Sequence, residues 1–264
     1  MKHTFFGNVK LGKLAPRHDE RTLKLSKYLV NVPNAPAVFD PDKNDILYAQ
    51  DGWGQMMNDQ LGDCTCAAMG HIVEWWSVLA GKQKFTVPDS EVLKAYEAVA
   101  GYDPNTGAND NGAVEVDVLN YWRSTGIAGH KLTAWAAIEV SNLERVKQAN
   151  WLFGAVYAGV ALPVACQNMG DRWDLPEGQS LTGEWAPGSW GGHAVPIISY
   201  DNGVAAIVTW GKRVKVTWRF LAAYFDEAYA PLSLDWIAGK AAPNGFDVAT
   251  LSADLRALEF SETF

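Results

Sequence analysis

Long apolar runs are missing from this chain of 264 residues. No stretch approaches the roughly 18–20 consecutive apolar residues that a membrane-spanning helix needs, which excludes that class of protein. The first residues, Met1 to Gly7, also lack the apolar core and small-residue cleavage site of a signal peptide. We therefore expect a protein that is located in the cytoplasm and has no membrane partner.

Cysteine is scarce, with three residues at Cys64, Cys66 and Cys166. Three cysteines do not make the framework of a disulfide-rich protein, and a reduced compartment is the simpler expectation. Cys64, Cys66 and His71 together suggest zinc, but no second ligand pair with the usual spacing follows in the chain. We therefore predict no metal site and no other cofactor.

Positive charge is scarce, because the chain has 22 Lys and Arg residues and 30 Asp and Glu residues, which gives a net charge of −8. This balance argues against nucleic acid or an anionic membrane surface as the main partner. Residues 1–50 are the exception, since they are first basic and then punctuated by proline. We predict an extended N-terminal arm over 1–50, with a short helix near residues 21–30, a main domain over 51–230 and a C-terminal extension over 231–264. Residues 247–258 of that extension have the pattern of an amphipathic helix.

Tryptophan, by contrast, is plentiful, with 12 residues. Most of these side chains are expected in the core, where large aromatic rings bury much apolar area. Another interpretation is that several of them line an aromatic groove that binds a ligand. The sequence leaves both interpretations open.

Helical patterns follow the arm. Residues 64–79 are apolar on almost every side and end at Gly81, which predicts a buried central helix. Residues 89–100 and 114–124 predict two further helices, separated by the turn-rich segment 102–112. The first half of the main domain is therefore expected to be helical.

Strand patterns dominate the second half. The expected strands are residues 132–140, 151–162, 164–167, 193–200, 204–210 and 213–217. Two helices are expected among them, over residues 141–150 with Ser141 as the cap and over residues 218–229. Helices first and strands second predict an α+β fold, in which a helical half packs against an antiparallel sheet half.

Cys64 and His193 are the most informative residues. Cys64 follows the Gly62-Asp63 turn and opens the central helix, where the N-terminal dipole favours a thiolate. His193 begins a strand, and a cysteine and a histidine far apart in sequence are the usual parts of a thiol nucleophile site. We predict a cleft with Cys64 on its helical wall and His193 on its sheet wall. His71 is a rival base, but it lies about 10 Å from Cys64 along the helix, beyond hydrogen-bond reach.

Three short motifs, in this order, resemble those of the papain-like cysteine peptidases. They are Gly62-Asp63-Cys64, Gly192-His193-Ala194-Val195 and Thr209-Trp210-Gly211. The resemblance runs from about residue 53 to about residue 229. It is nearest to a divergent branch of bacteria and their phages that carries an Asn-Asp-x-x-Gly-Asp-Cys motif, found here over residues 58–64. It implies a papain-like fold with Cys64 as nucleophile and His193 as base.

The resemblance also implies an oxyanion donor six residues before the nucleophile, where this chain has Asn58 in place of glutamine. The Asn58 amide can still donate an N–H to a developing oxyanion. An alternative register pairs Gln60 with Cys66, but Cys64 alone follows a glycine turn.

The orienting asparagine of the family falls on Val208, which cannot accept a hydrogen bond from an imidazole. Thr209 would take its place if the strand shifts by one residue. The resemblance further implies that Trp210 shields this contact.

Two functions follow from the resemblance. The first is a peptidase or amidase that hydrolyses a peptide or isopeptide bond of a protein or cell-wall peptide through Cys64 and His193. The second is a papain-like scaffold that has lost activity and serves as a phage or virion structural or binding module with a protein partner. The N-terminal arm is either a propeptide remnant or a permanent strap.

Overall fold

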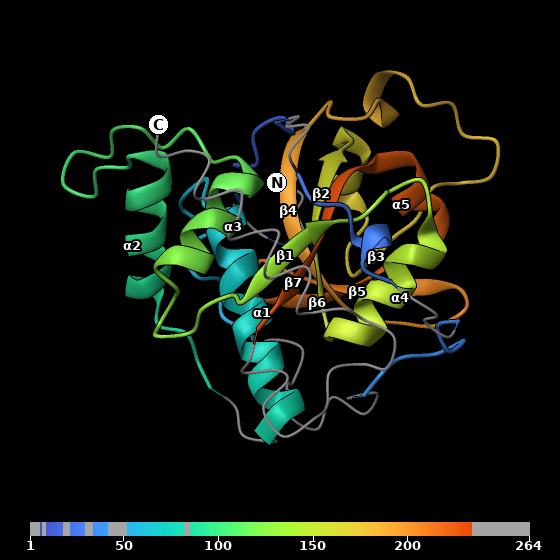
Figure 1. Cartoon of the computed structure of the whole chain (residues 1–264). Helices are drawn as coiled ribbons and strands as arrows, with labels where there is room; N and C mark the ends of the chain where they lie inside the picture. Colours follow the sequence, from blue (N-terminus) through green and yellow to red (C-terminus); the bar gives the residue numbers. More distant parts are fainter. Residues whose placement is uncertain are drawn as a thin grey trace.

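The computed structural model describes residues 6, 9–17, 22–29, 34–41, 52–81 and 85–233. Helices α1 (Cys64–Gly81), α2 (Asp89–Ala100) and α3 (Glu115–Ser124) form one half, beside a seven-stranded sheet that forms the other (Figure 1). The predicted α+β fold is therefore confirmed. The amphipathic helix predicted over 247–258 lies outside the described residues, and the predicted domain boundaries stay predictions.

Helix α1 runs through the middle of the molecule. Every residue from Cys64 to Trp76 is buried, as the uniformly apolar sequence predicts. Helix α2 ends where Gly101 adopts a left-handed conformation with φ 71°, which glycine takes without steric cost. The three predicted helices of the first half are thus confirmed to within two residues at each end.

The sheet has the order β1-β7-β2-β4-β5-β6-β3, and its neighbours are antiparallel except for the parallel pair β3 and β6. Its strands are β1 (Ala134–Ala137), β2 (Val156–Leu162), β3 (Arg172–Trp173), β4 (Gly191–Tyr200), β5 (Val204–Thr209), β6 (Lys212–Thr217) and β7 (Phe225–Leu232). The strands predicted over 193–200, 204–210 and 213–217 correspond to β4, β5 and β6. Three short 3-10 turns complete the description: η1 (Leu25–Lys27), η2 (Val164–Asn168) and η3 (Gly183–Trp185).

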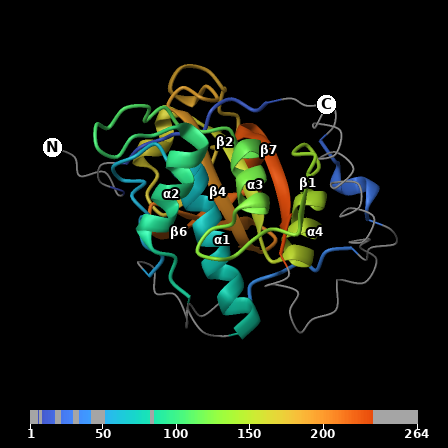
Figure 2. The same ribbon diagram turned by 60° about the vertical axis from the view of Figure 1, so that its left-hand side comes forward.

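Both faces of the sheet are covered, so its strands have apolar side chains on either side. Tyr157 and Ala194 pack into the core that α1, α2 and α3 share with one face. Val156 and Val195 pack into a second core with α4 (Leu143–Phe153) and α5 (Trp218–Tyr224) on the other face. Figure 2 shows α1 between α2 and α3 in front of the sheet. The close packing of α1 on β4 brings the predicted cysteine helix to the predicted histidine strand.

Two predicted elements of the second half are wrong in part. The helix expected over 218–229 ends at Tyr224, and β7 begins at Phe225 because this segment pairs with both β1 and β2. The strand expected over 164–167 is instead the 3-10 turn η2, which follows Pro163. Proline has no N–H to donate to a strand ladder, and β2 ends just before it.

The boundaries of two other helices also differ from the predictions. Helix α4 continues to Phe153, so residues 151–153 are helical rather than part of a strand. Its cap is Asn142, whose side-chain oxygen accepts from the Arg145 N–H at 3.1 Å, whereas the Ser141 hydroxyl donates to Glu139. Among the described residues of the N-terminal arm, Leu25–Lys27 alone form a helical turn, a 3-10 turn, within the segment 21–30 where a short helix was expected.

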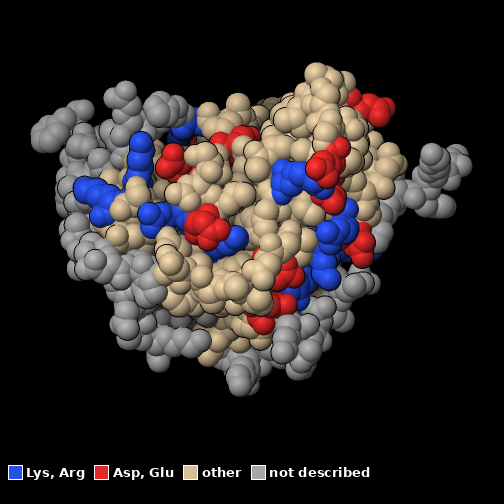
Figure 3. Space-filling model, turned by 90° about the vertical axis from the view of Figure 1, so that its right-hand side faces the viewer, with Lys and Arg blue, Asp and Glu red and all other residues tan. Residues whose placement is uncertain are grey.

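The described parts of the N-terminal arm run extended over the body, where Lys13 bridges to Ala113 and Phe39 bridges to Tyr200. On the face shown in Figure 3, basic and acidic side chains of the described residues are interspersed, so neither sign forms a continuous field there. Among the helices that the structure describes, none is long and apolar enough to span a membrane.

Candidate active site

Cys64 is the first residue of α1 and is almost fully buried. Burial raises the pKa of its thiol to about 12. Backbone groups of Ala194 on β4 and of Gly12 in the arm lie against the sulfur and oppose this rise. The neighbouring Asp63 carboxyl adds to it, and burial raises the pKa of Asp63 itself well above its usual range. In this state Cys64 is a neutral thiol at neutral pH.

His193 lies near the start of β4 and is also almost fully buried. Its Nε2 is 2.7 Å from the hydroxyl oxygen of Thr209, at the end of β5. Its Nδ1 is buried and has no hydrogen-bond partner within the described residues, so no such bond joins it to Cys64. Burial, aided by the nearby His71, lowers the pKa of His193 to about 3, which leaves a neutral imidazole.

The hairpin between β5 and β6 determines which residue meets the imidazole. Val208 faces the core of the helical half, and Thr209, one residue on, faces the opposite side and reaches His193. Trp210 and Gly211 form the turn with φ 47° and 74°, the positive values that a two-residue hairpin requires. The Trp210 ring stacks on His193, with centroids 4.4 Å apart and planes 17° apart. Thr209 thus contacts the imidazole and Trp210 covers one face of it, while their roles in orienting and shielding the base stay predictions.

Asn58 lies in the turn before α1 and is buried. Its side-chain nitrogen donates to the Leu61 carbonyl oxygen at 3.0 Å and to the Lys10 carbonyl oxygen at 3.4 Å. Both amide hydrogens are therefore in use, one of them toward the arm. Of the alternative pair, Gln60 is exposed and Cys66 is fully buried inside α1.

His71 is engaged elsewhere, because its Nε2 is 3.1 Å from the Gly54 carbonyl oxygen. Burial lowers its pKa to about 4. It is therefore a core residue, as its spacing from Cys64 predicts. Within the part of the chain that the structure describes, no group of histidine, cysteine and acidic residues has the arrangement of a metal site.

Comparison with solved structures identifies the fold of this chain. No protein-family model and no curated protein matches the sequence. Solved structures do match: xylellain, a cysteine protease of Xylella fastidiosa, has a TM-score of 0.60 at 14% identity, covering 86% of this chain and 97% of its own. The chain has the papain-like fold. The cysteine protease and lectin-like domains of Cwp84 from Clostridium difficile match with a TM-score of 0.57 at 12% identity, over 86% of this chain and 56% of theirs.

Recombinant stem bromelain precursor matches the papain-like fold of this chain as well, with a TM-score of 0.54 at 13% identity. That match covers 87% of this chain and 78% of the precursor. The names of the first two neighbours describe cysteine proteases, and at 12–14% identity the likeness shows the fold alone. Nothing in the matches supports a phage or virion protein, and the Asn-Asp-x-x-Gly-Asp-Cys branch stays a prediction.

Part of the predicted N-terminal arm lies over the candidate site. We call residues 9–17 the strap. The Lys10 carbonyl oxygen accepts from the Trp210 indole at 3.3 Å, and the Lys13 N–H donates to the Gly192 carbonyl oxygen at 3.2 Å. On its other side the Gly12 carbonyl oxygen accepts from Ala113 at 2.8 Å. The strap therefore passes between the turn that carries Cys64 and the strand that carries His193.

The fit of the strap depends on glycine. A Cβ atom on Gly12 would lie 1.6 Å from the Gly62 carbonyl oxygen, and one on Gly192 would lie 2.3 Å from the Lys13 carbonyl oxygen. Neither backbone could stay in place beside such an atom. The sequence predicts the extended arm as a propeptide remnant or a strap, but it does not indicate which groups Gly12 contacts.

Proposed function

We propose that the chain is a cysteine peptidase or amidase that hydrolyses a peptide or isopeptide bond with Cys64 as nucleophile and His193 as base. The observation that carries this proposal is the unsatisfied Nδ1 of His193. A buried ring nitrogen without a partner is costly, whereas Nε2 of the same ring is held by Thr209. A general base that meets its proton donor only during the reaction is expected to have one ring nitrogen held and the other without a partner.

The chemistry follows from the positions of the atoms. If Thr209 accepts from the Nε2–H, Nδ1 carries the lone pair and can take the Cys64 proton. The thiolate attacks the carbonyl carbon, and His193 then gives the proton to the leaving amine. Water hydrolyses the resulting thioester. Asn58 would contribute to oxyanion binding with the hydrogen that it now donates to Lys10.

The strap makes this enzyme latent. The Gly12 backbone lies against the Cys64 sulfur, and the Lys10 carbonyl oxygen accepts a hydrogen bond from the Asn58 amide. A substrate carbonyl can therefore reach neither group until the strap moves. Burial also favours the neutral thiol and the neutral imidazole over the ion pair. Displacing the strap admits water and should lower the pKa of Cys64.

Alkylation by iodoacetamide tests the proposal. Gly12→Ala should displace the strap because its Cβ cannot pass the Gly62 carbonyl, whereas Leu14→Ala removes an exposed side chain of the same strap. We expect slow labelling of Cys64 in the wild type and in Leu14→Ala, and labelling at least about tenfold faster at pH 7 in Gly12→Ala.

Hydrolysis of unfolded casein provides the second measurement. Gly12→Ala should degrade casein, and Gly12→Ala combined with Cys64→Ala should not. A Cys64 in Gly12→Ala that is accessible but reacts only near pH 8.5, like a free thiol, together with no loss of casein, would sink the enzyme proposal.

A second candidate is a papain-like scaffold without activity that binds a protein partner. It is favoured by the closed strap and by Val208 at the position of the orienting asparagine. For this candidate, peptide binding would survive Cys64→Ala while no variant hydrolyses a substrate.

A further inference from the structure

The side chain of Lys13 leaves the strap and is completely buried. Its ammonium nitrogen lies 2.8 Å from Asp226 Oδ2 and 2.8 Å from Glu227 Oε1, and it donates to the Leu14 carbonyl oxygen at 3.2 Å. Lysine is almost never fully buried unless it is paired. A strap that only needed to cover the site could do so with a small or apolar residue.

The space around this side chain is built as a pocket, formed by Glu115, Gly159, Asp226 and Glu227, which we call the acidic pocket. A Cβ atom on Gly159 would lie 2.1 Å from the Lys13 Cε, so the aliphatic stem needs a glycine in β2. Tyr229 donates to Glu227 Oε2 at 2.7 Å and fixes that carboxylate.

The acidic pocket holds more carboxyl groups than its one lysine pairs with. Glu115 is completely buried, and neither of its carboxyl oxygens has a hydrogen-bond partner within the described residues. Burial alone would lower the pKa of Lys13, but Glu115, Glu227 and Asp226 raise it, so the lysine stays charged. Burial, with Glu227 nearby, raises the pKa of Glu115 well above its usual range.

The acidic pocket adjoins the reacting groups. The same Lys13 whose side chain fills it donates its backbone N–H to Gly192, the neighbour of His193, and the preceding Gly12 lies against Cys64. An extended peptide in the place of the strap would therefore present one side chain to this pocket.

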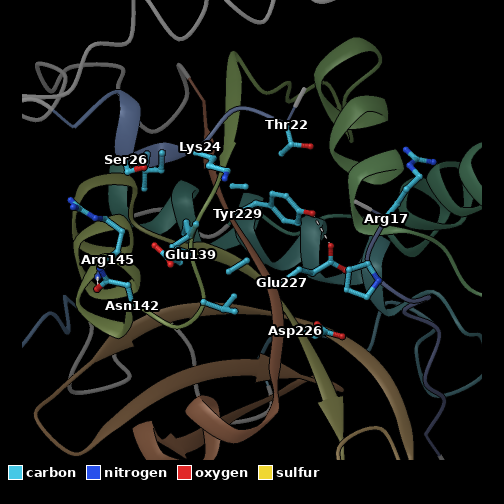
Figure 4. A pocket seen from close by; sticks show the side chains of 16 residues that line it. Arg17, Thr22, Lys24, Ser26, Glu139, Asn142, Arg145, Asp226, Glu227 and Tyr229 are labelled. Carbon is cyan, nitrogen blue, oxygen red and sulfur yellow. Dashed lines mark hydrogen bonds between the residues drawn. The ribbon is translucent and has the colours of Figure 1, made fainter. Parts of the chain in front are cut away.

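The acidic pocket is also reached from outside. Asp226 and Glu227 line a cavity of about 760 Å³ together with residues of the arm and of the segment after β1. Figure 4 shows Asp226, Glu227 and Tyr229 projecting from β7 among the residues that line it. A charged side chain thus has a hydrated route to the carboxylates once the strap has left.

We propose that the acidic pocket is the specificity pocket of the enzyme and selects peptides with a long cationic side chain, lysine in particular, whose place Lys13 holds in the closed state. This inference rests on the proposed cysteine peptidase function. Glu227 and Asp226 select the charge, and Gly159 admits the unbranched stem. An uncharged side chain of similar length would leave the buried Glu227 carboxylate and the partly buried Asp226 carboxylate unpaired.

Peptide selectivity tests this inference in the full chain. Lys13→Ala empties the acidic pocket, and Gly12→Ala, which retains Lys13, is the second variant in case Lys13→Ala does not fold. The probes are acetylated tetrapeptide coumarylamides in which one position at a time is lysine or norleucine, its uncharged equivalent. At one position we expect kcat/KM to be at least about tenfold higher for lysine. Adding Glu227→Gln should reduce this ratio several-fold.

Binding separates the failure of this inference from failure of the proposed activity. The same peptides are titrated by fluorescence polarisation against variants that also carry Cys64→Ala. A lysine preference in binding without hydrolysis would support the acidic pocket and contradict the peptidase proposal. Hydrolysis with equal rates for lysine and norleucine at every position would overturn the acidic pocket alone, and the absence of both binding and hydrolysis would overturn both.

Discussion

At the scale of single residues, one hydroxyl group determines what the imidazole can do. A neutral histidine has one donor and one acceptor nitrogen, and a hydrogen bond to one nitrogen fixes the role of the other. Thr209 lies at Nε2 and no described residue is bonded to Nδ1. With Thr209 as acceptor, the lone pair points away from the sheet hairpin and is available for the Cys64 proton.

Thr209→Val removes this hydroxyl at nearly constant shape. We expect the free energy of unfolding to fall by about 1–3 kcal/mol, because Nε2 becomes a buried donor without a partner. Nitrogen NMR shifts of His193 should show a mixture of tautomers in place of one. Thr209→Ser, which keeps the hydroxyl, should restore both values. A single unchanged tautomer in Thr209→Val would mean that Thr209 does not orient the ring.

At the scale of elements, α1 is held to the sheet half by its tryptophans. Trp75 Nε1 donates to the Gly154 carbonyl oxygen and Trp76 Nε1 to the Phe153 carbonyl oxygen, each at 2.8 Å. These carbonyls lie where α4 turns into β2. These hydrogen bonds fix the C-terminal half of α1 against the sheet half and so help to position Cys64 in the first turn of the helix.

Trp76→Phe tests this anchoring, with Trp122→Phe as its matched control. Both indoles are buried, and their rings pack against each other with centroids 5.5 Å apart. Trp76 donates a hydrogen bond, whereas Trp122 Nε1 has no partner within the described residues. Urea unfolding should show Trp76→Phe to be less stable than Trp122→Phe by about 1–3 kcal/mol. Equal losses would show that packing alone holds α1.

Elements whose ends are set by local chemistry were the ones that the sequence predicted well. Residues 89–100 form α2 as expected, because Pro88 precedes it and Gly101 takes a left-handed conformation after it. The segment 218–229 was predicted as one helix, yet its second part is β7. That strand is determined by pairing with β1 and β2, which no local pattern encodes.

At the scale of the whole molecule, the candidate site also combines contacts that local sequence predicts with contacts that only the fold determines. The contact between His193 and Thr209 could be predicted because short motifs carry both residues, and the catalytic roles of Cys64 and His193 stay predictions. The glycine contacts of the strap could not be predicted, because Gly12, Gly62 and Gly192 become neighbours only in the fold. The acidic pocket likewise draws on α3, β2 and β7.

Burial of two histidines in a neutral state couples the stability of the whole molecule to pH. The pKa values of His71 and His193 are lowered by burial to about 4 and about 3, against about 6.5 in an unfolded chain. As pH falls below about 6.5, the unfolded chain binds protons that the folded chain does not. The stability that comes from burying these two histidines as neutral rings is therefore complete above this pH and is lost as pH falls toward 4. The buried carboxyls Asp63 and Glu115, whose pKa values burial raises, act in the opposite direction from about pH 4 upward and so offset part of this loss.

We expect each of the two histidines to contribute up to about 1.4 kcal/mol per pH unit to a fall in the free energy of unfolding between pH 6.5 and pH 4.5, against the opposing contribution of Asp63 and Glu115. Urea titrations across this range measure the slope. His71→Gln should change the slope by one histidine's share, up to about 1.4 kcal/mol per pH unit, whatever it does to stability at pH 7. Ile72→Val truncates the next core residue of α1 and removes no titrating group, so it should lower stability and keep the slope. A slope that stays the same in His71→Gln would mean that His71 is not buried as a neutral ring, and that α1 is packed less tightly against the site than its contacts indicate.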